Sequence, residues 1–389
     1  MINLTIKLPV ICDEKITNSL YQTVCRYTES FNRVSIEGWQ QKRINGVELH
    51  KLTYYKEKEL SKLPSQLVCS ARVKATEALK SAKSNLKNGR KVSVPRSIRC
   101  PIRYDARSYR IDFSKNIASL ATIEGRKIVN ISIPEFYKAK LSWKVCSADL
   151  CMTKNQKFFL HVSIETEEQL VKASGKVIGV DLGINRPAVT SDNKFFGEKR
   201  WKEIEARNFR LKRQLQAKGT KSAKKHLKIL SWKVNRFRKD CDHVLSKKIV
   251  TSASEGDTIV LEILKNIRKR VKARKKERRK IHAWSFERLR TFLSYKSKLY
   301  GVFVDYVDPR YTSQRCSDCG HIEKSNRKQS WFKCKACGFQ HNADLNAARN
   351  IRFVYLDSKG ISVTIGPHVN RPIVSAPARD KLPALAGSY

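Results

Sequence analysis

The sequence predicts a mixed α/β and β protein with more than one domain. Strand-like alternation of apolar and polar residues opens the chain, gives way to helical patterns, and returns after residue 91. In the second half, short apolar strands alternate with helical stripes, which is typical of a mixed α/β domain. Two closely spaced cysteine pairs interrupt that half and indicate a small metal-bound insert. A chain of 389 residues is long enough for two or three such domains.

The amino-terminal half is expected to combine a sheet with a helical insertion. Residues 2–8 alternate as a half-buried strand does, and Asp13 is a candidate N-cap for the helices that follow. Apolar residues then recur at helical spacing until Gly89, so we predict helices over residues 13–90. Beyond them, four alternating runs predict a small antiparallel barrel or sheet, at residues 109–113, 129–133, 141–145 and 158–164. We expect the first strand to pair with these runs across the insertion.

The region from residue 174 has the element order of a ribonuclease H-like arrangement. Strand-like segments precede a helical stripe, and strands and helices alternate after it. The strands are expected at residues 177–182, 188–191, 194–196, 258–263 and 302–307, and the last helix before the cysteines at 286–299. This order predicts a mixed sheet with helices packed on it.

The charge balance indicates a polyanionic partner. Eighty Lys and Arg stand against thirty-five Asp and Glu, which gives a formal charge of +45 and a pI near 10.1. Such a chain repels itself unless a polyanion neutralises it, so nucleic acid is the favoured partner. A ribosomal or merely basic soluble protein remains the alternative, because charge alone says nothing about chemistry.

Cysteine usage and hydropathy predict a soluble, cytoplasmic protein, associated with the nucleoid if its source is prokaryotic. Seven of the eleven cysteines are scattered singly, which fits a reducing compartment with one metal site better than a disulfide scaffold. The chain shows no signal-peptide pattern at its start and no run of about eighteen apolar residues. We therefore expect no membrane partner, and the sequence identifies no protein partner.

Three carboxylates in apolar surroundings are candidate ligands for Mg²⁺. Asp181 ends one predicted strand, Glu262 lies in another, and Asp344 lies early in a predicted helix. Each alone is explained by a salt bridge, a cap or a strand end. Together they offer the oxygen ligands that Mg²⁺ prefers, and a pair of ions held by such acids can promote phosphodiester hydrolysis. Because they are about eighty residues apart in the sequence, only the fold could assemble them.

Two Cys-x-x-Cys pairs fourteen residues apart predict a structural Zn²⁺ site. Four thiolates suit tetrahedral zinc and leave no open position for catalysis. Gly320 and Gly338 follow the pairs, where such turns often require a positive φ. A redox dithiol would need a thioredoxin-like context, which is absent, and His321 and His341 are surplus to the site. The expected ligands are Cys316, Cys319, Cys334 and Cys337.

A basic run follows the predicted strand of Glu262 and could hold phosphates. Residues 265–280 contain eleven Lys or Arg and one acid, although a solvated helix or lid is the alternative. Tryptophans 201, 232 and 284 lie among basic residues and could stack bases, although most tryptophans are core residues. The candidate nucleic-acid contacts are Lys269, Arg270, Lys272, Arg274, Lys275 and Arg315.

Three segments together resemble the TnpB family of transposon-encoded, RNA-guided DNA endonucleases, which are related to type V CRISPR effectors. They are GVDLGINRPAV at 179–189, TIVLEIL at 258–264, and residues 307–351 with both cysteine pairs. In that family they correspond to the RuvC motifs and the inserted zinc ribbon. Three features depart from the family: a short recognition segment, a compact ribbon loop and the Pro-containing tail.

The resemblance implies a domain for each part of the chain. A wedge β-barrel would comprise 1–12 and 91–173, a helical recognition domain 13–90, a RuvC-like nuclease domain 174–311 and 341–354, and a zinc ribbon 312–340 that binds target nucleic acid. Residues 355–389, which are rich in Pro and Gly, are expected to be a disordered tail.

The resemblance also implies a Mg²⁺-dependent DNA endonuclease in which Asp181, Glu262 and Asp344 hold two metal ions and catalyse hydrolysis. It implies an omega-type guide RNA, a short motif beside the target, double-stranded DNA as substrate and an RNA–DNA heteroduplex. The alternatives are a miniature type V CRISPR effector, an RNA-guided DNA-binding regulator that does not cut, and a transposase that joins strands itself. The DNA that flanks the gene would distinguish a CRISPR effector from a transposon-encoded nuclease. The three acids argue against a regulator that does not cut.

Overall fold

The computed structural model describes residues 1–168, 172–183, 186–264 and 286–361. The chain divides into two compact units, Met1–Glu168 and Gln169–Tyr389. Within the described ranges, no helix combines the length and apolar character that crossing a bilayer requires.

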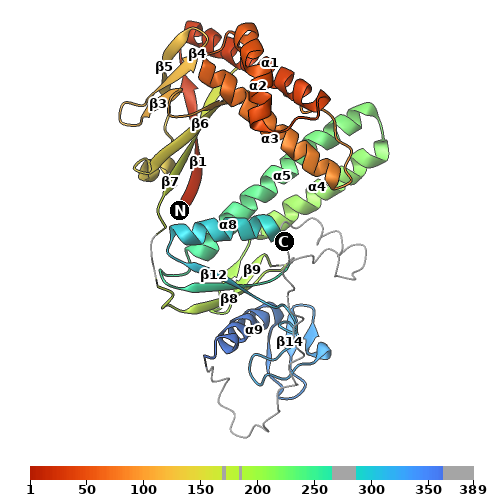
Figure 1. Cartoon of the computed structure of the whole chain (residues 1–389). Helices are drawn as coiled ribbons and strands as arrows, with labels where there is room; N and C mark the ends of the chain where they lie inside the picture. The colour runs from red at the N-terminus through yellow and green to blue at the C-terminus, as the bar shows by residue number, and fades with distance from the viewer. Residues whose placement is uncertain (169–171, 184–185, 265–285, 362–389) are drawn as a thin grey trace. The chain divides into compact units, whose positions relative to one another are not determined.

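The first unit is built on a seven-stranded antiparallel sheet with the amino-terminal strand at its centre (Figure 1). β1 (Ile2–Ile11) pairs with β7 on one side and with β5 on the other. The strand order is β2-β6-β7-β1-β5-β4-β3. The other strands are β2 (Ile102–Tyr104), β3 (Tyr109–Asp112), β4 (Ile117–Thr122), β5 (Gly125–Ile131), β6 (Lys144–Met152) and β7 (Phe158–Thr166). The expected pairing of the first strand across the helical insertion is confirmed.

This sheet is nearly closed. Its edge strands β2 and β3 are joined by a short turn, in which the Asp105 carbonyl accepts hydrogen bonds from the backbone N–H groups of Ser108 and Tyr109. The rings of Tyr104 and Tyr109 lie on either side of the turn with centroids 6.3 Å apart. The two strands form no ladder with each other among the described residues.

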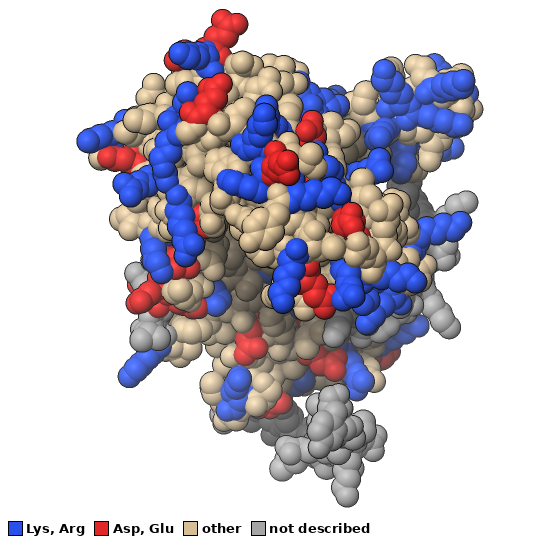
Figure 2. All heavy atoms as spheres, turned by 45° about the horizontal axis from the view of Figure 1, so that its top comes forward, with Lys and Arg blue, Asp and Glu red and all other residues tan. Residues whose placement is uncertain are grey.

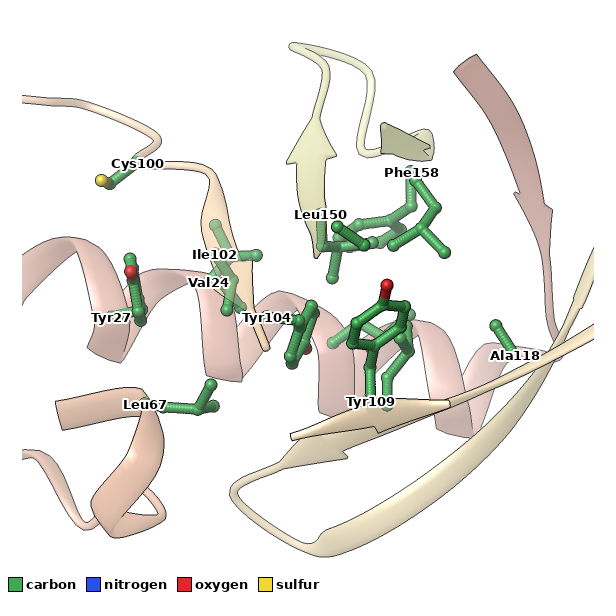
Figure 3. Close-up of a cluster of buried hydrophobic side chains, with 14 of the residues drawn as sticks. Val24, Tyr27, Leu67, Cys100, Ile102, Tyr104, Tyr109, Ala118, Leu150 and Phe158 are labelled. Carbon is green, nitrogen blue, oxygen red and sulfur yellow. The ribbon is translucent and has the colours of Figure 1, made fainter. Parts of the chain in front are cut away.

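Three helices, α1 (Glu14–Gln40), α2 (Gly46–Ser61) and α3 (Ser65–Lys87), form the expected insertion. Asp13 caps α1 by accepting a 2.7 Å hydrogen bond from the Ile16 N–H. Apolar side chains of α1 and α3 share one buried cluster with side chains of the sheet (Figure 3). The labelled members are Val24, Tyr27, Leu67, Cys100, Ile102, Tyr104, Tyr109, Ala118, Leu150 and Phe158. One core therefore holds helices and sheet together.

The strand expected at 141–145 was placed too early. A short 3₁₀ helix, η1 (Glu135–Lys140), precedes it, and β6 starts at Lys144 and continues to Met152. A bulge between Val145 and Ser147 breaks the alternation there, which hid the rest of the strand. The short strands β2 and β4 were not expected either.

The second unit contains a five-stranded mixed sheet with helices on both faces. The order is β10-β9-β8-β11-β12, in which β8, β11 and β12 are parallel and β9 and β10 antiparallel. The strands are β8 (Val177–Asp181), β9 (Ala188–Thr190), β10 (Phe195–Phe196), β11 (Thr258–Glu262) and β12 (Phe303–Val307). The helices are α4 (Lys199–Lys218), α5 (Lys221–Val250), α8 (Phe286–Leu299) and α9 (Ala343–Ser358). Figure 1 shows α8 and α9 on opposite sides of this sheet.

Side-chain alternation along the strands shows which helices cover each face of the five-stranded sheet. Ile178, Ile259 and Leu261 share an apolar cluster with residues of α5 and α8, whereas Val260 clusters with Ile351 of α9. Both faces are thus buried, which explains why these strands are apolar throughout.

The backbone of helix α9 packs directly against β8 because the strand has a glycine, Gly179, at the point of contact. A Cβ atom at Gly179 would lie 2.1 Å from the Ala348 carbonyl oxygen and 2.6 Å from the Arg352 nitrogen. No larger residue fits at Gly179 without moving α9.

The last part of the described chain contains a small three-stranded sheet and the end of α9. The sheet consists of β13 (Arg327–Lys328), β14 (Trp331–Lys333) and β15 (Gln340–Asn342), with β14 in the middle. The predicted start of the tail at residue 355 is too early, because α9 continues to Ser358. Leu356 is buried and holds the last turn of this helix. Residues 362–389 lie outside the described residues.

Replacing Gly179 with alanine should destabilise the second unit by about 1–3 kcal/mol, because the added methyl group overpacks against backbone. Urea denaturation monitored by circular dichroism would measure the loss. Gly46→Ala is the control, since the one tight contact of its Cβ, at 2.9 Å, would be with the end of the flexible Arg72 side chain, and its contacts with Thr76 would be at ordinary distances. Equal stability of the two variants would contradict this view of the α9 contact.

Candidate functional site

Two of the three predicted acids lie side by side at the ends of parallel strands. Leu261 of β11 is in register with Val180 of β8, and the next residues along the two strands are Glu262 and Asp181. Alternation places both on the same face as Gly179, the face that α9 covers. The carboxyl ends of these strands therefore present two carboxylates beneath α9.

The third acid begins the helix above them. Asp344 lies in the first turn of α9, where Asn342 is the N-cap and its side chain accepts from the backbone N–H groups of Asp344 and Leu345 at 3.1 and 3.2 Å. The partial positive charge of a helix N-terminus favours a carboxylate in this turn. Close packing at Gly179 brings this turn toward the strand ends.

The electrostatics show that the three acids form one cluster. Burial raises the pKa of Asp181 well above its usual range, and the charges of Glu262 and Asp344 raise it further. Burial also raises the pKa of Glu262, against a hydrogen bond from Thr312 and the charge of Arg327. Like charges buried together are costly unless cations neutralise them.

Sequence reasoning missed two residues of this cluster, Arg327 and Thr312. Arg327 of β13 donates from Nη2 to Asp344 Oδ1 at 2.8 Å, and the Thr312 hydroxyl donates to Glu262 Oε1 at 2.5 Å. Both lie near the cysteine pairs in the sequence, but nothing distinguished Arg327 from the other basic residues there. Charge compensation by Arg327 could be found only from the fold.

The four cysteines form a cluster that fits zinc. Their Sγ atoms all lie within 4.8 Å of one another, with 3.8 Å between Cys316 and Cys337 and 3.5 Å between Cys319 and Cys334. Four thiolates about 2.3 Å from a tetrahedral zinc lie about 3.8 Å apart, which matches this cluster. In the described part of the chain, no other group of three or more His, Cys, Asp or Glu is as close. The three acids thus form a more open group, in which Asp344 pairs with Arg327.

The two cysteine turns have the same backbone design. The Gly320 N–H donates to the Cys316 carbonyl at 3.0 Å and the Gly338 N–H to the Cys334 carbonyl at 3.2 Å, and both glycines have positive φ. Burial alone would raise the pKa of the Cys334 thiol, but backbone hydrogen bonds from Cys337 and Ala336 hold it below its ordinary value. These N–H groups favour the thiolate that zinc requires.

Two buried asparagines of α9 attach the first cysteine turn to the helix that carries Asp344. Asn346 accepts from the Ser317 N–H at 2.9 Å and donates to the Arg315 carbonyl at 2.8 Å. Asn350 donates to the carbonyls of Arg315 and Thr312 at 2.6 and 2.8 Å. The zinc cluster and the acid cluster therefore share one rigid support.

The other residues that the sequence singled out are the basic residues, histidines and tryptophans outside the two clusters. The Arg315 guanidinium lies over the Phe353 ring at 4.1 Å, so it packs on α9, and its contact with nucleic acid stays a prediction. His321 and His341 lie outside the cysteine cluster, and His341 belongs to β15. Lys269, Arg270, Lys272, Arg274, Lys275 and Trp284 lie outside the described residues. Trp201 packs against the core, whereas Trp232 is exposed.

Two family models match the chain. Residues 160–268 match the model described as "Probable transposase" (OrfB_IS605), and residues 286–351 match the "Cas12f1-like, TNB domain". The two matches include Asp181, Glu262, Asp344 and all four clustered cysteines.

Known relatives match over about half of their own length. The chain is 34% identical over 224 residues to the CRISPR-associated endodeoxyribonuclease Cas12f1 of Sulfoacidibacillus thermotolerans, which covers 52% of each chain. It is 33% identical over 163 residues to the TnpB-like protein aq_aa05 of Aquifex aeolicus (strain VF5), covering 40% of this chain and 52% of that protein. The similarity to the TnpB family that the motifs predict is confirmed.

One solved structure has a similar fold over both units. The cryo-EM structure of a Cas12f1–sgRNA–target DNA complex matches with a TM-score of 0.59 and 20% identity, covering 88% of this chain and 83% of that one. At this identity the match establishes a similar fold.

Replacing Asp181 with asparagine should stabilise the protein in Mg²⁺-free buffer at pH 8, by about 1 kcal/mol or more. The native pKa of Asp181 lies well above 3.8, the value expected in the unfolded chain. The wild type therefore loses stability as the pH rises from about 3.8 to the native pKa of Asp181. Asparagine does not titrate, so the difference should shrink as the pH falls toward 4. Urea denaturation at several pH values, without a chelator, would test this. A destabilising substitution at pH 8 would show that the buried charge is compensated.

Removing zinc should loosen the start of α9 as well as the cysteine turns. Hydrogen exchange should speed up in residues 312–342 and in the first turns of α9 after chelation, because Asn346 and Asn350 hold both parts together. The amino-terminal unit provides the control and should keep its protection. Faster exchange in the cysteine turns with α9 unchanged would rule out the coupling.

Proposed function

From the relationship of this chain to the TnpB-like and Cas12f proteins, we propose that it is an RNA-guided DNA endonuclease with a RuvC-type, ribonuclease H-like catalytic domain. The convergence of Asp181, Glu262 and Asp344 from three distant segments carries the proposal. A structural role for each acid alone would not require that like charges be buried together.

The architecture of the second unit supports the ribonuclease H-like assignment. Its sheet order, with antiparallel strands on one side of β8 and parallel strands on the other, agrees with the expected mixed sheet. The cysteine cluster lies between β12 and α9 in the sequence, as an inserted ribbon should.

The three acids would hold Mg²⁺, because carboxylate oxygens such as those at the ends of these adjacent strands are the ligands that this ion prefers. Bound there, Mg²⁺ supplies charge neutralisation for the phosphate and a more acidic water. The Thr312 hydrogen bond fixes one oxygen of Glu262 and leaves the other available. Arg327, which pairs with Asp344, would contact a phosphate of the strand being cut.

Guide RNA and target DNA are the proposed partners. The known Cas12f1 structure contains an sgRNA and target DNA, and the formal charge of +45 on this chain suits a large polyanion. Figure 2 shows Lys and Arg spread over the visible face, with Asp and Glu much less frequent. Such a surface can hold a heteroduplex by its backbone while base pairing supplies sequence specificity. The guide would be omega-type if the gene lies in a transposon.

A miniature type V CRISPR effector is the second candidate, favoured by the match to the Cas12f1-like domain. Both candidates use the same acids and Mg²⁺. A repeat array or transposon ends beside the gene would distinguish them.

Guide-directed cleavage provides the test. The complex with its copurified RNA should cut matching DNA in Mg²⁺, and Asp181→Ala should reduce the rate by about 10³-fold or more while DNA binding persists. Asp192→Ala, which removes a partly exposed acid from the turn between β9 and β10, is the matched control and should cut normally. Persistent cutting by Asp181→Ala would refute the assignment of the acids.

A further inference from the structure

Helices α4 and α5 form an antiparallel hairpin with an unusual concentration of positive charge (Figure 1). Residues 199–239 contain sixteen Lys or Arg and two Glu, for a net charge of +14. Gly219, with φ +64°, ends α4, and the Thr220 hydroxyl caps α5 by accepting from the Ala223 N–H at 3.1 Å. The hairpin is thus well defined by its own sequence.

One side of α5 faces the rest of the hairpin, and the opposite side faces solvent. Ala223 and Leu230 are buried, and Leu227, Val234 and Phe237 are partly buried on the same side. At 100° per residue, the opposite side of the helix carries five cations around one tryptophan. These exposed residues are Lys221, Lys225, Lys228, Trp232, Arg236 and Lys239, which we call the α5 basic face.

The cations of the α5 basic face form no ion pairs with carboxylates of the described residues. Two acids in or beside the hairpin pair with other cations: Glu205 with Arg238 at 2.6 Å and Glu198 with Lys248 at 3.4 Å. Five mutually repelling charges on one side of a helix favour a polyanion at that surface.

Trp232 stands in the middle of this face with 66% of its surface exposed. An exposed indole among cations contributes nothing to the core, which lies on the other side of α5. A flat aromatic ring flanked by Lys and Arg is the arrangement that stacks on a base while the cations contact the neighbouring phosphates. By the rise of an α-helix, Lys221 to Lys239 extends about 27 Å, enough for several nucleotides.

We propose that the α5 basic face binds an unpaired segment of RNA, with one base stacked on Trp232 and the phosphates held by Lys228, Arg236 and their neighbours. In the proposed endonuclease this segment belongs to the guide RNA, so its identity rests on the proposed function. The binding itself does not, because it involves none of the catalytic acids.

Fluorescence anisotropy of the full-length, RNA-free protein with a labelled single-stranded oligo(U) 15-mer would test the proposal. Trp232→Ala should raise the Kd about tenfold and Trp232→Phe much less, because phenylalanine keeps a stacking ring. Heparin, a polyanion without bases, should bind both variants as it binds the wild type. Tyr55→Ala, which removes a ring that is 81% exposed in α2, is the control and should leave the Kd unchanged.

The electrostatic part is tested by two double variants of equal charge. Lys228→Glu with Arg236→Glu should weaken oligo(U) binding and reduce the slope of log Kd against log salt by about 1.4, since two phosphate contacts are lost. Lys224→Glu with Lys233→Glu changes the same net charge on the flanks of α5 and should change the slope less.

Four results would overturn the proposal. An unchanged Kd for Trp232→Ala would remove the stacking role, and an equal loss of heparin binding would show that Trp232 does not act by stacking on a base. A change of oligomeric state in Trp232→Ala would assign the face to a second copy of the chain. Tighter, Trp232-dependent binding of oligo(dT) than of oligo(U) would assign it to DNA. Failure of guided cleavage, in contrast, would leave these binding results intact.

Discussion

The direct packing of α9 on β8 is the contact on which the rest of the second unit depends. Because Gly179 has no side chain, the helix lies against the strand, and its first turn reaches the carboxyl ends of β8 and β11. Asp344 thereby joins Asp181 and Glu262. The same helix carries Asn346 and Asn350, which hold the first cysteine turn. One close helix–strand contact thus supports both clusters.

The acid cluster is under electrostatic strain without a metal ion. Burial and mutual repulsion raise the pKa of Asp181 and burial raises that of Glu262, while Arg327 and Thr312 offset part of the cost. A site that pays this cost in stability gains affinity for cations. The cysteine cluster differs, because its backbone hydrogen bonds already favour the thiolate of Cys334. This contrast fits a reactive role for the acid cluster and a structural role for the cysteine cluster.

Local patterns predicted the parts of the molecule that depend on local physics. Strand alternation, the Asp13 cap and the spacing of the cysteines are short-range signals, and the structure contains the elements that they predict. The bulge that hid much of β6 and the roles of Arg327 and Thr312 depend on contacts between distant residues. The three acids lay between these extremes, since their residue types were visible but only the fold brings them together. Recognising the α5 basic face required both the helical register of its residues and their exposure, and only the structure supplies the exposure.

We propose above that the three acids together bind divalent metal ions. Anomalous diffraction from crystals soaked in Mn²⁺, a substitute for Mg²⁺, would locate the ions directly. We expect Mn²⁺ between Asp181, Glu262 and Asp344, and a separate zinc signal among Cys316, Cys319, Cys334 and Cys337. A zinc signal without any Mn²⁺ at the three carboxylates would contradict the account.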